Sequence, residues 1–526
     1  MAARGRKSPR RSSKPKSSKT AAASPQARPA NTLLVWEDDP EPAVTVERPV
    51  PDLSKEPLAF SFSGAKPVPA RYPQGTDKFR YWTTAEALRR GADFWAGHVP
   101  AGKWQVGPIL RVLRDEGEDL NAYYDRKALN FFHGQGPHGT VYSAESPDVA
   151  CHEMGHAVLD AIKPQLWDAT ADEIAAFHES FADISAILSA IQLPSLRQAI
   201  LTDTKGQLYR DSRLSRLAEQ LGSAIRMSHP DAVERTSLRN AVNSFTYADP
   251  ISLPASAPAT QLSSEPHSFS RVFTGAVFES MAGMLVVKAK KPHSPTADEL
   301  LQIGNEIAAI LVNAVKQAPV VPNFYAQVAA IMVVEAGKLD VKYAAALKGV
   351  FVRRAVLSLH SATHVEALHG SVAAARRARM AGAAPSVDDD LEIAALPGGN
   401  YGLAKPLFVR VASHHRPYLA QGGNSLENAL EPPSSSTASR AFVDDLFRRG
   451  AVDYYAISGA GYRLDSHRTT KTHNVVKTAG GHELVRRMFD CGFCFGGTFT
   501  RSRHSNAKDK KAEKAHRHGR QNRQGR

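Results

Sequence analysis

His152, Glu153 and His156 form an H-E-x-x-H pattern, in which two imidazoles and a carboxylate could work on one metal ion. Ser146 followed by Pro147 predicts that a helix starts just before them, because Ser caps helices and Pro is favoured at the first helical position. Histidines four apart on a helix share one face, one turn apart. The spacing is typical of zinc sites in which the Glu is a general base.

A second helix predicted downstream supplies a candidate third ligand. Thr170 and Glu173 form a capping-box pattern that predicts its start. Glu179 and Asp183 lie four positions apart on that helix. Catalytic zinc commonly takes three protein ligands, so Glu179 could be the third, and Asp183 could accept the free ring N–H of a ligand His. The alternative is a pair of ordinary helices with solvated acids and histidines, but the combined pattern favours the metal site.

Together these residues resemble the thermolysin family of gluzincin metallopeptidases. That family pairs an H-E-x-x-H helix with a second helix that carries a Glu ligand and an Asp four residues later. The resemblance covers roughly residues 80–360. It implies an α+β fold, a thermolysin-like two-lobed metallopeptidase domain with a mixed N-terminal lobe and a mainly helical C-terminal lobe. It also implies Zn²⁺ as cofactor and a protein or peptide as substrate.

The resemblance extends to four other places in the sequence. The run that begins Asn121-Ala122 is similar to the family's edge strand, which binds the substrate backbone. His267 corresponds to a transition-state-stabilising His, and Arg239 to an Arg that binds a substrate carbonyl. A loop histidine without a task and an ordinary basic residue are the alternatives for these two. Asp148 matches an acid that helps to bind calcium in the family.

The sequence also departs from the family pattern. Three extra residues separate His156 from Glu179, and His178 stands where the family has an Asn before the Glu ligand. The acids that would complete the calcium sites are not evident near Ala190, so the sequence does not support Ca²⁺ dependence. No signal peptide or large inhibitory pro-domain is evident before the predicted domain.

These assignments predict how the residues would act. Glu153 would take the proton of a zinc-bound water as the water attacks a peptide carbonyl. His267 and Arg239 would stabilise the resulting oxyanion, and Asn121 and Ala122 would hold the substrate as an added strand. The alternative function is a catalytically inactive metallopeptidase-fold protein that serves as an interaction or scaffold module anchored by its basic tails.

The net charge of +14 over 526 residues is concentrated at the two ends of the chain. Residues 1–30 and 501–526 together carry more positive charge than the whole chain, so the body between them is slightly acidic. Such like-charged blocks are expected to be disordered and could attract a non-specific anionic partner. The near-neutral body argues against a dedicated nucleic-acid binder.

Hydropathy and cysteine content predict the compartment. No run of 18 or more apolar residues occurs, so no transmembrane segment is expected. Cys151, Cys491 and Cys494 are too few for a disulfide framework. We expect Cys491 and Cys494 to be free thiols; half of a structural zinc site is the alternative. A cytoplasmic location is expected, with unconventional secretion as the alternative.

Composition and turn signals divide the chain into six predicted segments. These are a disordered basic tail (1–30), a strand- and turn-rich segment (31–77), the metallopeptidase domain (78–360), a helical and linker region (361–437), a small α/β module (438–500) and a second disordered basic tail (501–526).

Overall fold

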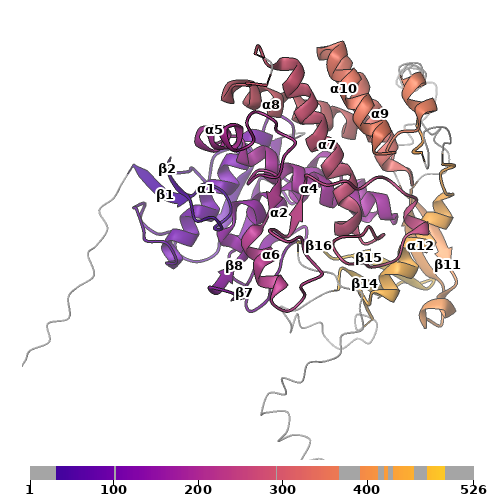
Figure 1. Cartoon of the computed structure of the whole chain (residues 1–526). Helices are drawn as coiled ribbons and strands as arrows, with labels where there is room; N and C mark the ends of the chain where they lie inside the picture. Colours follow the sequence, from indigo (N-terminus) through magenta and orange to yellow (C-terminus); the bar gives the residue numbers. More distant parts are fainter. Residues whose placement is uncertain are drawn as a thin grey trace, which may run out of the picture.

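The computed structural model describes residues 31–99, 102–291, 293–365, 391–412, 420–423, 430–454 and 471–491. Both basic tails and Cys494 lie outside these residues, as do residues 366–390, 413–419 and 424–429 of the region expected to be helix and linker. Helices and strands both contribute to the fold (Figure 1), so the predicted mixture of α and β structure is confirmed.

The first sheet combines four strands from the N-terminal part of the described chain with one strand from its C-terminal end. Its strand order is β16-β5-β6-β4-β3. β3, β4 and β6 pair in parallel, whereas β5 is antiparallel to β6 and β16 is antiparallel to β5. The strands are β3 (Ala59–Phe62), β4 (Ile109–Leu113), β5 (Ala122–Tyr124), β6 (Ala128–Phe131) and β16 (Phe489–Asp490).

Three short antiparallel pairs surround this sheet and the first helices. They are β1 (Thr32–Trp36) with β2 (Thr45–Pro49), β7 (His133–Gly136) with β8 (Gly139–Tyr142), and β9 (Arg216–Leu217) with β10 (Arg239–Asn240).

The helices from α1 to α10 build the middle and the far side of the molecule (Figure 1). The first six are α1 (Asp77–Trp95), α2 (Pro147–Ile162), α3 (Gln165–Asp168), α4 (Asp172–Ala190), α5 (Pro194–Asp203) and α6 (Glu219–Arg226). The next four are α7 (Pro266–Lys288), α8 (Ala297–Gln317), α9 (Phe324–Leu339) and α10 (Val341–Arg353).

Helix α2 starts where the sequence predicts. The Ser146 hydroxyl accepts the N–H of Val149, and Pro147 occupies the first turn. The Ser146 bond satisfies one amide N–H that has no partner within the helix, and Pro147 has no N–H to satisfy. Together they fix where the helix begins. The two histidines of the motif therefore lie well inside a regular helix.

Helix α4 is the central helix of the fold. Every one of its residues is buried, and it packs against α1, α2, α7 and α9. A helix that is covered on all sides must be apolar nearly all round. Glu179 and Asp183 are exceptions to that rule, so their charges have to be satisfied inside the protein.

The capping box predicted at the start of α4 is wrong. The Thr170 hydroxyl donates to the Arg410 carbonyl at 2.7 Å and caps no helix amide. The Glu173 carboxylate accepts the Tyr247 hydroxyl at 2.5 Å and the Tyr325 N–H at 2.9 Å. Tertiary partners take both side chains, so local capping geometry does not form.

A second five-stranded sheet, in the order β11-β12-β15-β14-β13, lies against the start of α4. Its link to that helix includes the Thr170 bond and the bond from Arg486 Nε to the Trp167 carbonyl at 2.9 Å. Its elements are β11 (Glu392–Leu396), β12 (Leu407–Val411), β13 (Val452–Asp453), β14 (His473–Lys477), β15 (His482–Arg486) and the covering helix α12 (Ser435–Arg448).

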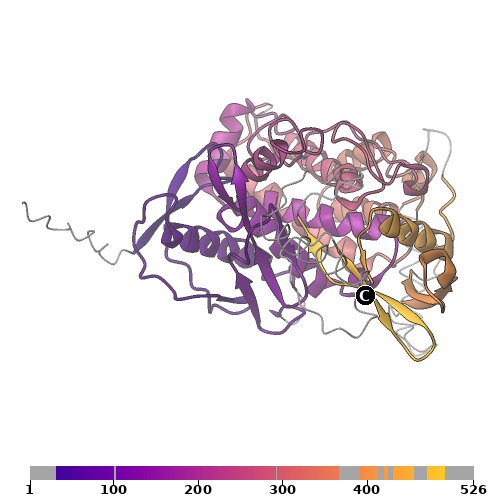
Figure 2. The ribbon, with the colours of Figure 1, turned by 90° about the horizontal axis from the view of Figure 1, so that it is seen from below.

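The chain leaves this second sheet and returns to the first. β15 ends at Arg486, and β16 pairs with β5 only a few residues later. In Figure 2 the yellow C-terminal strands reach from the outer edge of the molecule to its centre. The sequence predicts that residues 438–500 form a small α/β module, but β16 within this segment completes the N-terminal sheet.

Helix α7 is long and apolar enough to cross a membrane, by length and composition. Within this protein, 78 % of its most apolar stretch is buried, against α4, α8 and α10. Most of its hydrophobic residues therefore have partners in the core, whereas Val286 near its end is exposed.

Gly155 allows α2 and α4 to approach closely. A β-carbon at this position would lie 2.7 Å from the Ala182 Cα and 2.7 Å from the Ser185 Cβ. Backbone cannot yield as a flexible side chain can, so the absence of a side chain at Gly155 sets the spacing of the two helices. That spacing determines how far the motif histidines lie from Glu179.

We predict that Gly155→Ala destabilises the metal-free protein by about 1–3 kcal/mol, because it overpacks the contact between α2 and α4. Gly349→Ala is the matched control, since Gly349 is an exposed position in α10 where a β-carbon meets nothing within 4 Å. The control should be neutral or stabilise by up to about 1 kcal/mol. Equal denaturant midpoints for the two variants would contradict the close-approach argument.

Candidate metal centre

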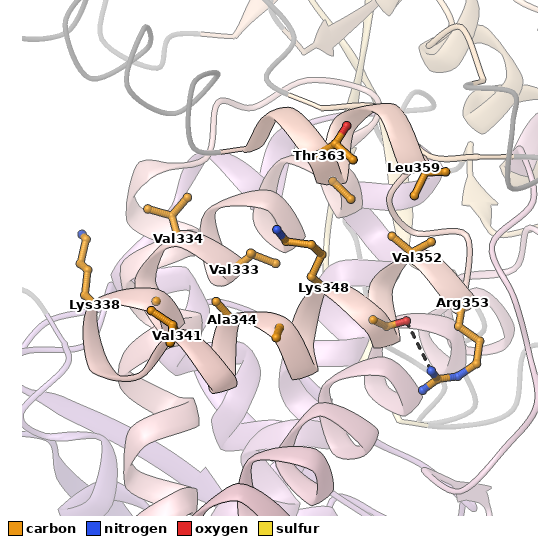
Figure 3. A pocket seen from close by; sticks show the side chains of 14 residues that line it. Val333, Val334, Lys338, Val341, Ala344, Lys348, Val352, Arg353, Leu359 and Thr363 are labelled. Carbon is orange, nitrogen blue, oxygen red and sulfur yellow. Dashed lines mark hydrogen bonds between the residues drawn. The ribbon is translucent and has the colours of Figure 1, made fainter.

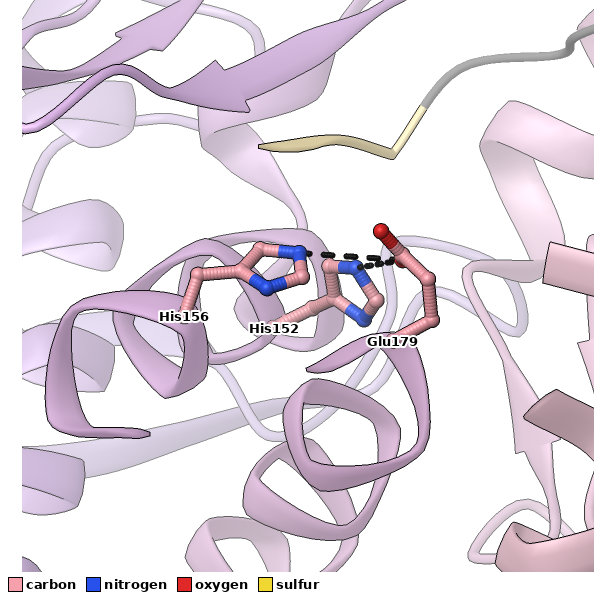
Figure 4. Close-up of side chains that lie close together, drawn as sticks. All are labelled: His152, His156 and Glu179. Atoms are coloured by element: carbon pink, nitrogen blue, oxygen red, sulfur yellow. Dashed lines mark ion pairs between the residues drawn. The ribbon is translucent and has the colours of Figure 1, made fainter. Parts of the chain in front are cut away.

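The two motif histidines and Glu179 meet between α2 and α4, as predicted. The Glu179 Oε2 atom lies 3.3 Å from His152 Nε2 and 3.6 Å from His156 Nε2. One ligand atom from each residue lies within 4.8 Å of the other two. Figure 4 shows the three side chains pointing at one another from the two helices.

The facing atoms lack the hydrogen bonds that buried polar atoms normally have. His152 Nε2, His156 Nε2 and Glu179 Oε2 are all buried, and none has a hydrogen-bond partner in the protein. An unsatisfied buried polar atom costs about 1–3 kcal/mol, so three at one point call for a common partner. A divalent cation that accepts nitrogen and oxygen ligands fits this donor set.

His152 is oriented by an ion pair behind it. Its Nδ1 lies 3.0 Å from Asp183 Oδ1, which also accepts from Arg239 Nη2 at 2.8 Å. Burial alone would raise the pKa of Asp183, but Arg239 and His152 outweigh it and lower this pKa to about 2. The ionised carboxylate therefore accepts the Nδ1 proton of His152, which leaves the Nε2 lone pair facing the site.

His156 is oriented by a residue whose role the sequence analysis missed. Its Nδ1 lies 2.9 Å from Nδ1 of His178, the residue directly before Glu179. Burial lowers the pKa of both histidines, with help from neighbouring cations, so both are neutral. With the His156 lone pair at Nε2, its Nδ1–H donates to His178. The sequence could have indicated this role, because a ligand His needs an acceptor for its other ring N–H and His178 directly precedes the predicted ligand Glu179.

Glu153 lies beside the three ligands without being one of them. It is buried, and neither of its carboxylate oxygens has a hydrogen-bond partner. One of its oxygens lies within 4.8 Å of ligand atoms of His152 and Cys491. Burial, followed by the charges of Glu179 and Asp490, raises the pKa of Glu153. A bound cation would oppose that rise.

The structure places His267 at the site as well. Its Nε2 is 3.4 Å from Glu179 Oε2, and its Nδ1 is 2.7 Å from Oε1 of Glu265, the residue that caps α7. Burial alone would lower the pKa of His267, but Glu179 and Glu265 raise it to about 10. In the metal-free protein, protonated His267 donates from Nε2 to the Asp490 carbonyl, and a cation bound by Glu179 would oppose the rise in the pKa of His267.

The predicted substrate-binding residues Asn121 and Ala122 lie at the edge of the first sheet. The Asn121 side chain accepts the N–H of Ala122 at 2.8 Å and also bonds to Asp490. The Ala122 carbonyl accepts the N–H of Cys491 at 2.8 Å. The chain's own β16 therefore occupies this edge, a contact that no sequence pattern indicated.

Arg239 lies behind the site. Its guanidinium bonds to both Asp183 oxygens and comes within 3.4 Å of His152 Nδ1. The structure thus gives it a part in positioning Asp183, while binding of a substrate carbonyl stays a prediction.

Asp148, the residue matched to a calcium ligand, is buried at the start of α2. Its Oδ2 accepts the N–H of Ala218 at 3.1 Å, and its pKa is raised by burial and by Asp38 and Asp39. In the described part of the chain, two groups of three or more side chains are placed so that they could hold a metal ion. Both groups include His152, and neither includes Asp148.

A separate hollow of about 970 Å³ lies along α9 and α10, away from these residues (Figure 3). Val333, Val341, Val352 and Leu359 line it, together with lysine and arginine side chains. Its lining contains no His, Cys, Asp or Glu, so it offers neither metal ligands nor a carboxylate base.

No protein-family description matches this sequence, and comparison with curated proteins finds no match. The argument for function therefore depends on the geometry of the centre itself.

We predict that His178→Leu raises the dissociation constant for zinc by about 10–100-fold, because the His156 ring loses the acceptor that orients it. His178→Asn should stay close to the native value, because the Asn side-chain oxygen can take the place of the imidazole Nδ1. Competition with a chromophoric chelator measures both constants. Equal affinities in the two variants would rule out this role for His178.

Proposed function

We propose that this protein is a zinc-dependent metalloendopeptidase of the thermolysin-like, gluzincin kind. The observation that carries the proposal is the pairing of three buried, unsatisfied ligand atoms with an equally unsatisfied carboxylate, that of Glu153. A structural site needs ligands only. A buried base beside the ligand set is what hydrolysis requires in addition.

The donor set supports zinc as the metal. Two imidazoles and one carboxylate are a common ligand set of catalytic zinc, which keeps a fourth position for water or substrate. Zinc bound there would lower the pKa of a water molecule towards roughly 7. The neutral state of His156 suits this role, because ligands must be deprotonated to bind a metal. The ionised state of Asp183 suits it as well, because this carboxylate accepts the Nδ1 proton of His152 and leaves Nε2 for the metal.

The residues around the ligands support peptide hydrolysis. Glu153 would accept the proton of the attacking water and pass it to the leaving amine. His267 would donate a hydrogen bond to the oxyanion that forms on the carbonyl carbon. Once β16 has left the edge of β5, Asn121 and Ala122 would receive the peptide there as an extra strand, a mode in which the backbone supplies affinity.

The architecture supports the thermolysin-like part of the proposal. A sheet-containing N-terminal lobe precedes a mainly helical part, and the two helices with the ligands lie between them. Positions on long helices are rigid, which suits a constellation that must hold its geometry.

The pairing of β16 with β5 favours a second candidate. If β16 never leaves this edge, the same fold would serve as a catalytically inactive interaction module, with the basic tails as anchors to anionic partners. A cytoplasmic location remains an expectation from the sequence under either proposal.

We predict different outcomes for the two glutamates. Glu179→Ala should reduce bound zinc, because it removes one of the three ligands that meet between α2 and α4. Glu153→Gln should keep one zinc per chain, since the ligand set is complete, but should abolish peptide hydrolysis because an amide cannot accept the proton of water. Elemental analysis and turnover of a fluorogenic peptide library measure the two properties.

Both glutamate variants should be made in the native chain and in a Cys491→Ala chain, because β16 lies across the site in the native fold. Full hydrolysis by Glu153→Gln, or native protein that binds no zinc, would contradict the proposed function.

We predict that His267→Ala lowers kcat by roughly 10²–10³ while zinc stays bound, because the oxyanion loses its donor. His229→Ala is the control, since His229 lies in the loop after α6 and bonds to Ser228. Steady-state kinetics and zinc content are measured together. A native rate in the His267 variant would remove this residue from the reaction.

A further inference from the structure

The last described residues of the chain, Phe489 to Cys491, lie directly on the metal centre. In Figure 4 the C-terminal strand, in pale yellow, passes above the three ligand side chains. We propose that Cys491 is a fourth metal ligand and that this segment occupies the place of a peptide substrate, so that the site is closed until the segment is displaced. The inference concerns regulation of the site and rests on the proposed function.

The backbone of this segment is held as a substrate strand would be. β16 pairs antiparallel with β5, with Phe489 opposite Tyr124 and Asp490 opposite Tyr123. The Cys491 N–H extends the ladder to the Ala122 carbonyl. A peptide and β16 would need the same edge of the sheet, so they cannot bind together.

The carbonyl of Asp490 takes the place of a substrate carbonyl. It accepts the hydrogen bond of His267 Nε2, the group assigned to the oxyanion in the proposed reaction. The Asp490 side chain is bonded to Asn121, the other predicted substrate-binding residue. Backbone and side chain of one residue thus occupy two of the groups that would hold a substrate.

The side chain of Cys491 then lies beside the metal centre. It is only 1 % exposed, and its Sγ lies within 4.8 Å of ligand atoms of both His152 and Glu153. That position is next to the ligands and beside the base, where the attacking water would have to be. Thiolate sulfur is a preferred zinc ligand, and four protein ligands make a closed site.

Phe489 anchors the segment to the ligand shell. Its ring stacks on His178 with the centroids 3.9 Å apart, and on His156 at 5.1 Å. The Arg486 guanidinium covers the same ring at 4.1 Å, and Trp167 meets it edge-on at 5.3 Å. Because Phe489 packs on His178, and His178 orients His156, the position of the segment is coupled to the geometry of the metal centre.

Closure and opening need no change of oxidation state. As the metal–sulfur bond forms, the thiol proton passes to solvent and the sulfur takes the fourth position in place of water. Opening reverses this step: the sulfur is protonated, water binds, and β16 leaves β5. A closed site with no bound water leaves the Asp490–Cys491 peptide intact beside Glu153.

The test uses the full-length chain loaded with zinc and X-ray absorption at the zinc edge. The native protein should show one sulfur neighbour at about 2.3 Å, which Cys491→Ala should replace with a lighter atom. Cys151→Ala is the control, because the Cys151 thiol is buried but donates to the Ala87 carbonyl. This variant should keep the sulfur neighbour.

Both cysteine variants should keep one zinc per chain, which also reports that they fold. Absence of sulfur in the native protein, or its survival in Cys491→Ala, would overturn the proposal.

Peptide turnover separates this proposal from the proposed function. If the closed state dominates, Cys491→Ala should hydrolyse peptides about tenfold faster or more, because the competent fraction rises. Slower turnover in Cys491→Ala than in the native protein would overturn the closure. Sulfur ligation that is lost in Cys491→Ala, with no hydrolysis by any variant, would support the fourth ligand and contradict the peptidase.

Discussion

The rest of the structure depends on one unfavourable arrangement, the burial of polar atoms that no protein group satisfies. His152 Nε2, His156 Nε2 and Glu179 Oε2 face one another in the interior without a hydrogen bond. Each would cost about 1–3 kcal/mol if it stayed so, and three at one point concentrate that cost. A cation at their common point would turn this cost into binding energy, and the residues behind the ligands orient the ligand atoms towards that point.

Two features hold these atoms in place. The missing side chain of Gly155 sets the distance between α2 and α4, and full burial of α4 prevents Glu179 from reaching water. Behind the ligands, Asp183 and His178 each take one ring N–H, so both imidazoles present their lone pairs to the site. Arg239 in turn keeps Asp183 ionised, so the residues that orient the ligands are themselves held in place by a further residue.

Local patterns in the sequence predicted the ligands, and non-local contacts explain what was missed. Ser146 and Pro147 begin α2 as expected, because capping is decided within one helical turn. The capping box at Thr170 failed because Arg410, far along the chain, bonds to its hydroxyl. The pairing of β16 with β5 likewise joins segments far apart in sequence, and two residues are too few for a strand pattern. No sequence pattern therefore indicated that the free thiol of Cys491 lies beside His152 and Glu153.

The most direct test of the central claim is anomalous diffraction from crystals of the native protein grown with zinc, recorded above and below the zinc absorption edge. The account predicts a single strong peak between α2 and α4, within bonding distance of His152 Nε2, His156 Nε2 and a Glu179 oxygen. Ordered water at that point, with the three side chains in place and no anomalous peak, would contradict it.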